Sequence, residues 1–449
     1  MTTLLKPGQV VQAEAAGLPC QVEAFLGGGG QGEVYSARLG STAVALKWYF
    51  PQWATRAQRS ALETLVRKGS PSTLFLWPID LASAATVPGF GYVMPLRPSR
   101  FKSGTDLAKR RIEPTFRALT TAGINLADGF LQLHARGLAY RDISFGNLFL
   151  DPKTGEVLIC DLDNVGVDGQ AHNTVGGTMR FMAPEIVRGE ASPSSRTDQF
   201  SLAVLLHFLF FMAHPLEGQR ETAFGCLDHT AQLRLYGTAP LYIADPDDKS
   251  NRPVRGLHDN LLTFWPIYPR FLKELFTRAF TVGLRAPAER IKESEWRAAL
   301  VQLRDSIVYC AACAAENFAD QAATPAEGAA TCWACRRPLE LPLTLHLGRA
   351  FVMLNHDTRL YPHHLDEQRL YDFSRPVAEV TRHPTKTDIW GLKNLSGTCW
   401  SSTSPSGQDA DVEPGRSVTL AAGTRLRFGK VAGEIRYAGS PEALPAGSR

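Results

Sequence analysis

Long apolar runs are scarce in this sequence of 449 residues, and so is any excess of charge. The most apolar stretch, Leu202 to Met212, is short and is interrupted by His207. It therefore predicts a buried helix rather than a membrane span. The first residues, Met1 to Gln9, contain no apolar core of the kind that secretory signals carry. We accordingly expect no membrane association and a cytoplasmic location.

The formal net charge is +4, with 20% charged and 44% apolar residues. So small a charge on so long a chain does not indicate a nucleic-acid partner, and the length allows about two to three domains.

Cysteine is also sparse. Of the eight cysteines, four form two close pairs, and the other four are scattered at Cys20, Cys160, Cys226 and Cys399. This pattern favours a metal site in a reducing compartment over a disulfide framework.

One stretch carries most of the functional signal. Asp142 and Asn147 lie five residues apart and precede the apolar run Leu148 to Leu150, and a second apolar run ends at Asp161. Phosphoryl transfer needs a carboxylate that accepts the proton of the attacking hydroxyl, and an amide and a carboxylate that hold Mg²⁺. The order of these residues resembles the catalytic and metal-binding loops of protein kinases.

Glycines upstream of this stretch follow a phosphate-binding pattern. Gly27, Gly29 and Gly32, followed by Val34, fit Gly-x-Gly-x-x-Gly-x-Val. Without Cβ atoms, the backbone amides of such a turn can close over a triphosphate. A plain glycine-rich hairpin would look the same. A dinucleotide-binding fold would require a helix after the last glycine, but the residues that follow are typical of a strand.

A lysine at the end of an apolar strand follows the glycine loop. Lys47 matches the kinase lysine that contacts the α- and β-phosphates, and Glu63, on a helix predicted over Arg59 to Lys68, is its expected carboxylate partner. A surface lysine and a solvated glutamate are the alternatives. In the resemblance, Phe90 to Leu96 leads into the hinge between two lobes. The residues that the resemblance assigns to the nucleotide pocket beside the glycines are Val34, Ala45, Lys47, Met94 and Leu96.

Three positions depart from the kinase pattern. Leu162-Asp163-Asn164 follows Asp161 where Phe-Gly is usual, Tyr140 stands where His is usual, and Ser144 stands where serine/threonine kinases carry Lys. We expect Leu162 to fill the apolar slot and Asp161 to keep its metal-binding role. The role of the missing lysine near the γ-phosphate is left unfilled.

Residues 177–185 match the kinase stretch that docks substrate and ends in Ala-Pro-Glu. The resemblance implies that Glu185 pairs with a buried Arg290. It also implies that Asp198 ties the buried helix to the catalytic loop.

Two threonines of this segment, Thr174 and Thr178, are candidate regulatory hydroxyls. Because Arg141 precedes the catalytic Asp142, a phosphate on Thr174 could pair with it and order the segment. An ordinary loop threonine is the alternative.

Two Cys-x₂-Cys pairs, separated by eighteen residues, follow the kinase-like region. The spacing predicts that four thiolates close a tetrahedral zinc site with no open position, so that the metal is structural. The expected ligands are Cys310, Cys313, Cys332 and Cys335. The small polar segment between the pairs has no core of its own, so the metal would stabilise this unit.

Residues 341–438 alternate apolar and polar positions between turn residues, which predicts short antiparallel strands in a sandwich. This region resembles forkhead-associated domains, which read phosphothreonine. In the resemblance Arg349 and Ser374 would contact phosphate. However, Val377 replaces the expected His, and Cys399-Trp400 replaces Asn-Gly. A docking or scaffold module is the alternative.

Over about residues 18–305 the chain resembles bacterial serine/threonine protein kinases of the eukaryotic-like type. The implied fold class is α+β. The implied domains are a bilobal kinase over 1–305 (N-lobe about 18–95, C-lobe about 98–305), a zinc ribbon over 306–340, an all-β sandwich over 341–438 and a disordered tail over 439–449.

The implied activity is ATP- and Mg²⁺-dependent phosphorylation of protein hydroxyls, including autophosphorylation, with ATP, Mg²⁺ and structural Zn²⁺ bound. A pseudokinase scaffold and a kinase of small molecules are the rival hypotheses. The arrangement also resembles kinases of tellurite-resistance-associated triads. That resemblance implies a von Willebrand-type protein and a metal-dependent phosphatase as partners beside the protein substrates.

Overall fold

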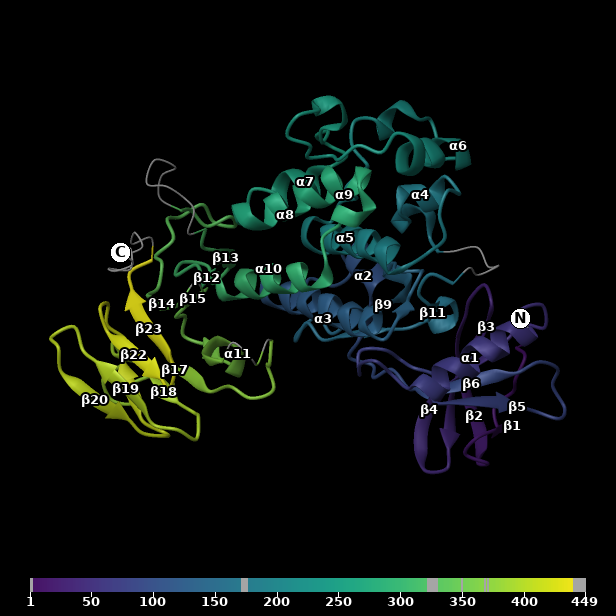
Figure 1. Cartoon of the computed structure of the whole chain (residues 1–449), viewed down its shortest axis with the longest axis horizontal. Coiled ribbons are helices and arrows are strands. Elements are labelled where there is room, and N and C mark those ends of the chain that lie inside the picture. Colours follow the sequence, from purple (N-terminus) through teal and green to yellow (C-terminus); the bar gives the residue numbers. More distant parts are fainter. Residues whose placement is uncertain are drawn as a thin grey trace. The chain divides into compact units, whose positions relative to one another are not determined.

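The computed structural model describes residues 3–170, 177–320, 330–348, 350–366, 369 and 371–438. They divide into two compact units: residues up to Phe264 together with Glu274–Arg297, and Trp265–Lys273 together with the residues from Ala298 on. Figure 1 traces the elements of both units along the chain. Helix α10 (Glu293–Asp305) begins in the first unit and ends in the second.

The first unit begins with an antiparallel sheet that closes on itself in the order β1-β2-β3-β4-β6-β5. Its strands are β1 (Val10–Ala13), β2 (Pro19–Gly28), β3 (Gly32–Leu39), β4 (Thr42–Tyr49), β5 (Asp80–Ser83) and β6 (Gly91–Pro95). An apolar cluster that includes Tyr35, Leu46 and Trp48 fills the sheet. Each such side chain contributes about 1.5–3 kcal/mol on burial. This cluster fixes the register, because a one-residue shift would turn it outward.

Helix α1 (Arg56–Lys68) follows β4. It begins at Thr55, whose hydroxyl accepts a hydrogen bond from the backbone N–H of Gln58 at 3.1 Å, and it ends at Gly69 with φ of 68°. Leu62 and Leu65 are its buried residues.

Two long helices, α3 (Phe116–Ala135) and α5 (Ser195–Phe211), pack against each other in the helical part of this unit. Helix α5 is buried on nearly every side, as its apolar sequence predicts. It begins earlier than the expected Leu202, because Ser194 and Thr197 form a capping box there.

Shorter elements complete the first unit and lead out of it. The helices are α2 (Gly104–Ala108), α4 (Pro184–Val187), α6 (His229–Gln232), α7 (Asp259–Phe264), α8 (Arg270–Phe280) and α9 (Val282–Arg285); the strands are β7 (Lys102–Ser103), β8 (Leu138–Ala139), β9 (Leu148–Leu150), β10 (Val157–Ile159) and β11 (Gly166–Val167). Single turns are η1 (Phe145–Asn147), η2 (Leu162–Asn164), η3 (Met179–Phe181), η4 (Glu221–Ala223), η5 (Leu233–Thr238), η6 (Lys249–Asn251) and η7 (Pro287–Glu289).

The second unit contains a two-stranded ribbon and two larger antiparallel sheets. Strands β12 (Ile307–Tyr309) and β13 (Glu316–Phe318) form the ribbon. The six-stranded sheet has the order β15-β14-β23-β22-β19-β20 and the four-stranded sheet the order β16-β17-β18-β21. Their elements are β14 (Thr344–Leu347), β15 (Ala350–Met353), β16 (Arg359–Leu360), α11 (Pro362–Leu365), β17 (Ala378–Arg382), β18 (Trp390–Asn394), β19 (Trp400–Thr403), β20 (Asp409–Val412), β21 (Ser417–Thr419), β22 (Arg425–Phe428) and β23 (Val431–Arg436).

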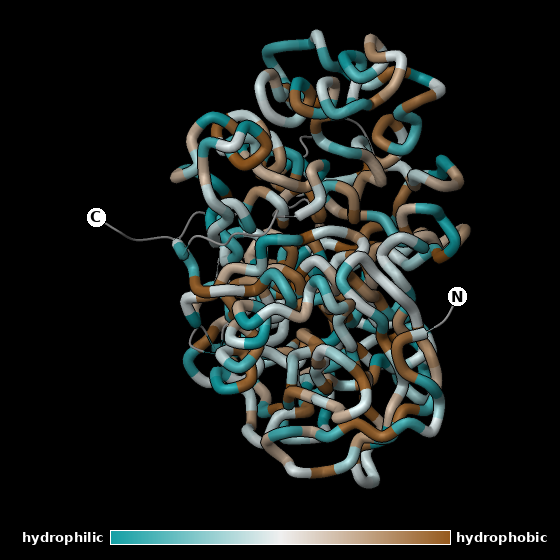
Figure 2. Tube along the Cα trace, turned by 90° about the vertical axis from the view of Figure 1, so that its right-hand side faces the viewer, coloured by the Kyte–Doolittle hydropathy of each residue, from teal (hydrophilic) through white to brown (hydrophobic). Residues whose placement is uncertain are grey.

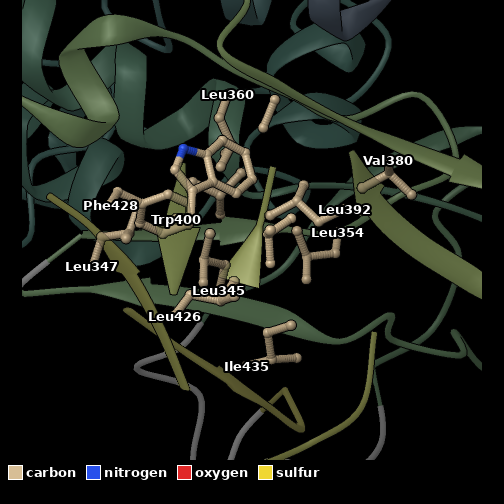
Figure 3. Close-up of a cluster of buried hydrophobic side chains, with 13 residues drawn as sticks. Leu345, Leu347, Leu354, Leu360, Val380, Leu392, Trp400, Leu426, Phe428 and Ile435 are labelled. Carbon is tan, nitrogen blue, oxygen red and sulfur yellow. The ribbon is translucent and has the colours of Figure 1, made fainter. Parts of the chain in front are cut away.

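Both larger sheets contribute to one apolar cluster. Leu345 and Trp400 come from the six-stranded sheet and Leu392 from the four-stranded sheet, and all three side chains are buried (Figure 3). The Trp400 ring packs edge-on against Phe428, with centroids 4.8 Å apart.

Hydrophobic and hydrophilic residues alternate over short stretches of the trace (Figure 2). Among the helices in the described part of the chain, none is both long enough and apolar enough to cross a membrane.

Candidate active site

The turn between β2 and β3 carries the predicted glycine loop. The N–H of Gly29 donates to the carbonyl of Gly32 at 2.9 Å, which closes the turn. A Cβ on Gly32 would lie 2.2 Å from the carbonyl oxygen of Trp48, so that position requires glycine. A Cβ on Gly27 or Gly29 would meet no atom within 4 Å. The backbone there is open to a ligand.

The other expected nucleotide-pocket residues lie on neighbouring strands of the same sheet. Val34 on β3 is the register partner of Lys47 on β4, and Ala45 on β4 is the partner of Met94 on β6. Leu96 follows the end of β6 and is half-buried. The sheet therefore brings Val34, Ala45, Lys47 and Met94 to adjacent positions, and Leu96 lies two residues beyond Met94.

Lys47 lies between two carboxylates. Its Nζ is 2.8 Å from Asp161 Oδ1 and also donates to Asp163 Oδ2. Asp163 Oδ1 in turn accepts hydrogen bonds from Tyr49 Oη at 2.6 Å and Tyr92 Oη at 3.3 Å. We call these five residues the Lys47 cluster. Lys47 and Tyr49 are two residues apart on β4, so they lie on the same face of the strand.

The predicted pair of Lys47 with Glu63 is wrong in this structure. Glu63 pairs instead with Arg59 Nε at 3.2 Å, and its side chain is 48% exposed. Helix α1 presents Gln58 to the Lys47 cluster, where its amide donates to the carbonyl oxygen of Asp163 at 3.2 Å. Five residues separate Gln58 from Glu63, which places them about 140° apart around the helix. The helix therefore turns its acid away from Lys47.

Burial and charge act in opposite directions within the Lys47 cluster. Burial alone raises the pKa of both carboxyl groups, because it disfavours their charged forms. At Asp161 the Lys47 ammonium outweighs burial and the pKa is lowered. At Asp163, which is more deeply buried, desolvation prevails and the pKa is raised to about 6. Burial lowers the pKa of Lys47, but the two carboxylates outweigh it and the net pKa is raised.

The catalytic-loop candidates lie within hydrogen-bond distance of one another. Asn147 Nδ2 donates to Asp142 Oδ2 at 3.0 Å and to the Asp142 carbonyl at 2.9 Å. The backbone N–H and the hydroxyl of Thr178 donate to Asp142 Oδ1 at 3.0 and 3.3 Å. Burial and the charge of Asp161 raise the pKa of Asp142, although these hydrogen bonds lower it. A raised pKa suits a carboxylate that takes up a proton.

Two residues of this region have left-handed backbone. Arg141 has φ of 73° and Asp161 has φ of 55°. Such conformations cost non-glycine residues about 1–3 kcal/mol and tend to occur at functional sites. Nothing in the sequence signals them.

Asp198 at the start of α5 bonds to the loop that leads to Asp142, as the resemblance implies. It accepts hydrogen bonds from the backbone N–H groups of Tyr140 at 2.6 Å and Arg141 at 2.9 Å. His134 Nε2 lies 3.1 Å from the same carboxylate, and His134 Nδ1 lies 2.7 Å from Glu293. The loop is thus anchored through its backbone.

Tyr140, which replaces the usual His, also has a definite position. Its hydroxyl donates to the carbonyl oxygen of Cys160, the residue before Asp161. The side chain is buried and packs edge-on against Phe130. Tyr140 therefore connects its own loop to the segment that leads into Asp161. The tyrosine at this position thus joins the two segments through its hydroxyl group.

Glu185 and Arg290 form the expected ion pair through two hydrogen bonds, of 2.7 and 2.8 Å. Arg290 also donates to the carbonyl of Arg196 at 3.0 Å. The arginine opposes the effect of burial and lowers the pKa of Glu185. This bidentate geometry is the strong form of such a pair.

Of the regulatory candidates, Arg141 donates to the carbonyls of Val167 at 2.8 Å and Gln170 at 3.2 Å. Thr174 lies outside the described residues. Thr178 is at the Asp142 carboxylate rather than at Arg141.

Sequence reasoning missed the partner role of Asp163 and the contributions of Tyr49 and Tyr92. One signal was available, because Tyr49 shares a strand face with Lys47. The sequence shows Asp163 as part of a departure from the kinase pattern, but no pattern links it to a lysine 116 residues away.

The four paired cysteines form a second candidate site. Their Sγ atoms all lie within 4.8 Å of one another, with Cys310 and Cys335 3.6 Å apart and Cys313 and Cys332 3.7 Å apart. Sulfurs placed tetrahedrally at the usual Zn–S distance are about 3.8 Å apart. Both pairs fold alike: Ala314 N–H bonds to the Cys310 carbonyl at 2.8 Å, and Arg336 N–H bonds to the Cys332 carbonyl at 2.9 Å. The donor set and its spacing fit zinc.

Comparison with protein families finds a match in the middle of the chain. Residues 102–265 match the family model of the protein kinase domain. The matched segment contains Asp142, Asn147, Asp161, Glu185 and Asp198.

Curated relatives match over part of their length. A probable serine/threonine-protein kinase CCRP1 of Zea mays is 35% identical over 115 residues, which is 25% of this chain and 18% of the relative. A putative serine/threonine-protein kinase F31E3.2 of Caenorhabditis elegans is 32% identical over 120 residues, 26% of this chain and 25% of the relative. CBL-interacting protein kinase 4 of Oryza sativa subsp. japonica is 32% identical over 109 residues, 23% of each chain. The chain thus spans a quarter or less of the length of these relatives.

Proposed function

We propose that this protein is a serine/threonine protein kinase that transfers the γ-phosphate of ATP to protein hydroxyls, its own included. The observation that carries the proposal is that Lys47, from the first sheet, lies against the segment that contains Asp142, Asn147 and Asp161. Lys47 is 2.8 Å from Asp161, and Asp142 is 3.0 Å from Asn147. The charge of Asp161 also reaches Asp142. The matched kinase-domain segment supports the same activity.

The proposed reaction gives each group a role that its contacts support. Asp142 accepts the proton of the attacking hydroxyl: Asn147 fixes its Oδ2, while Oδ1 faces the exposed Thr178. Lys47 would contact the α- and β-phosphates of bound ATP as a buried cation. The backbone amides around Gly27, Gly29 and Gly32 would cover the triphosphate.

Asn147 and Asp161 would hold Mg²⁺. Asn147 turns its Nδ2 to Asp142, which leaves its Oδ1 for a cation, and oxygen donors of this kind suit Mg²⁺. The ion would neutralise charge on the phosphates as they transfer.

The test is incubation with radiolabelled ATP and Mg²⁺, comparing the wild type with Asp142→Ala. Label on protein from the wild type alone is the expected result, with a loss of about a thousandfold or more in the variant. Label on a small molecule would point to the small-molecule kinase. Nucleotide binding without any transfer would point to a pseudokinase scaffold.

We propose also that Cys310, Cys313, Cys332 and Cys335 bind a structural zinc ion. Metal analysis of the purified chain should find one zinc ion per chain. Cys332→Ser should lose it, because three thiolates leave the tetrahedron open. Cys399→Ser, which changes an exposed cysteine outside the cluster, is the matched control and should retain the metal.

The two sheets of residues 341–438 are proposed to form a forkhead-associated-like module that docks protein partners. Of its expected phosphate contacts, Arg349 lies outside the described residues, and Ser374 is exposed, with its N–H bonded to Asp372 Oδ1 at 2.9 Å. A von Willebrand-type protein and a metal-dependent phosphatase are the proposed partners of a bacterial kinase of this type. Co-purification with each, with and without prior phosphorylation, tests the proposal.

A further inference from the structure

Asp163 carries the most deeply buried carboxylate of the Lys47 cluster. Its side chain is 1% exposed, against 41% for Asp161. One oxygen accepts a hydrogen bond from Lys47, and the other accepts from Tyr49 at 2.6 Å and Tyr92 at 3.3 Å. All three of these partners have buried side chains. The Asp163 carboxylate is therefore held by three side chains of the first sheet, two from β4 and one from β6.

Helix α1 supplies no competing acid at this point. The carboxylate of Glu63 pairs with Arg59, which also bonds to Glu14, so Glu63 already has a counter-charge of its own. The residue of α1 that reaches the cluster is Gln58, whose amide donates to Tyr49 Oη at 3.3 Å and to the Asp163 carbonyl at 3.2 Å. An amide contributes no negative charge.

We propose that Asp163 is the positioning residue that holds Lys47 for the nucleotide, in the place of an acid on α1. The inference rests on the proposed function. Asp161 is the proposed metal ligand, so its carboxylate cannot serve Lys47 alone. A buried ammonium needs a lasting counter-charge, and Asp163 provides it. Lys47 is then held by the segment that follows Asp161, and its position does not depend on a swing of α1.

The test compares two matched amide variants, Asp163→Asn and Glu63→Gln, by kinase activity and by direct titration with ADP. Asp163→Asn should lower kcat/KM for ATP by about a hundredfold, the usual effect of removing one preorganised charge contact. Its ADP affinity should fall about tenfold. Glu63→Gln should stay within about threefold of the wild type in both, because its ion pair is exposed.

A double-variant cycle separates positioning from a general structural role. In a Lys47→Met background, Asp163→Asn should produce little further loss of ADP affinity, because its effect passes through Lys47. Equal losses in both backgrounds would overturn the proposal. So would Asp163→Asn at wild-type affinity.

If Asp163→Asn does not fold, Glu63→Gln alone tests which acid positions Lys47. A tenfold or greater loss of ADP affinity in Glu63→Gln would show that Glu63 positions it. Failure of the proposed function is a separate result. A wild type that binds ADP but transfers no phosphate would reject the kinase, while the affinities would still decide the role of Asp163.

Discussion

Two buried aspartates of the first unit are bonded in different ways. Asp198 accepts hydrogen bonds from two backbone N–H groups, those of Tyr140 and Arg141, and from His134. Within the described part of the chain, the Asp163 carboxylate accepts hydrogen bonds from side chains alone, namely the ammonium of Lys47 and the hydroxyls of two tyrosines. One carboxylate therefore fixes the course of the chain, and the other fixes a charge.

The difference determines how each site responds to a change. A backbone N–H can only donate, whereas a tyrosine hydroxyl can rotate and accept. An amide in place of Asp198 must turn its NH₂ toward an N–H donor. An amide in place of Asp163 can keep its oxygen toward Lys47 and offer its NH₂ to the hydroxyls. Replacing Asp198 by an amide should therefore destabilise the fold strongly. Replacing Asp163 by an amide should destabilise the fold only slightly, but it removes the negative charge beside Lys47.

The largest expected effect is on folding. Asp198→Asn should lower the free energy of unfolding by about 3 kcal/mol, because a buried N–H then faces another donor. Asp163→Asn should lower it by about 1 kcal/mol, since Asp161 still balances Lys47 and the hydroxyls adapt. Urea unfolding followed by tryptophan fluorescence measures both. An equal or larger loss for Asp163→Asn would break the comparison.

The second effect is a pH dependence of stability that arises at His134, which contacts Asp198. Burial opposes the charged form of His134, but its bonds to Asp198 and Glu293 outweigh burial and raise its pKa from 6.5 to about 9. The proton therefore stabilises the fold fully below pH 6.5, and this contribution is lost as the pH rises through 9. The shift corresponds to about 3 kcal/mol. Burial raises the pKa of Asp168, but hydrogen bonds from Ser195 and the charge of His134 outweigh it and lower that pKa.

The check is urea unfolding of the wild type and His134→Gln between pH 6 and pH 9.5. The wild type should be the more stable near pH 6, and the difference between the two should shrink toward pH 9.5. A difference that stays constant over this range would show that His134 acts through packing alone.

Local order in the sequence was enough to predict the loop that Asp198 anchors. Asp142 and Asn147 are five residues apart, so a short turn between apolar strands places their side chains in contact. The Glu185–Arg290 pair spans a long separation. It was predicted through the resemblance to protein kinases, in which the Ala-Pro-Glu stretch has an arginine partner, and not from local order.

The Lys47 side could not be predicted in the same way. Leu62 and Leu65, spaced about one helical turn apart, are the buried residues of α1. That spacing does not state whether the neighbouring Glu63 turns toward the sheet or away from it. The rotation of α1 depends on tertiary packing and on Gln58, which looks like any surface residue in the sequence. The closing of the first sheet through β1 and β5 likewise depends on long-range pairing that no local pattern encodes.

The smallest effect distinguishes the two tyrosines that bond to Asp163. Tyr49 Oη lies 2.6 Å from Asp163 Oδ1 and Tyr92 Oη lies 3.3 Å from it, so the first hydrogen bond is the stronger. Tyr49→Phe should lower the free energy of unfolding by about 1 kcal/mol and Tyr92→Phe by about 0.5 kcal/mol, with both rings kept in place. Urea unfolding of the two variants measures this order. A larger loss for Tyr92→Phe would contradict this order. It would mean that the Asp163 carboxylate is held mainly by the tyrosine of β6 and not by Tyr49, which lies beside Lys47 on β4.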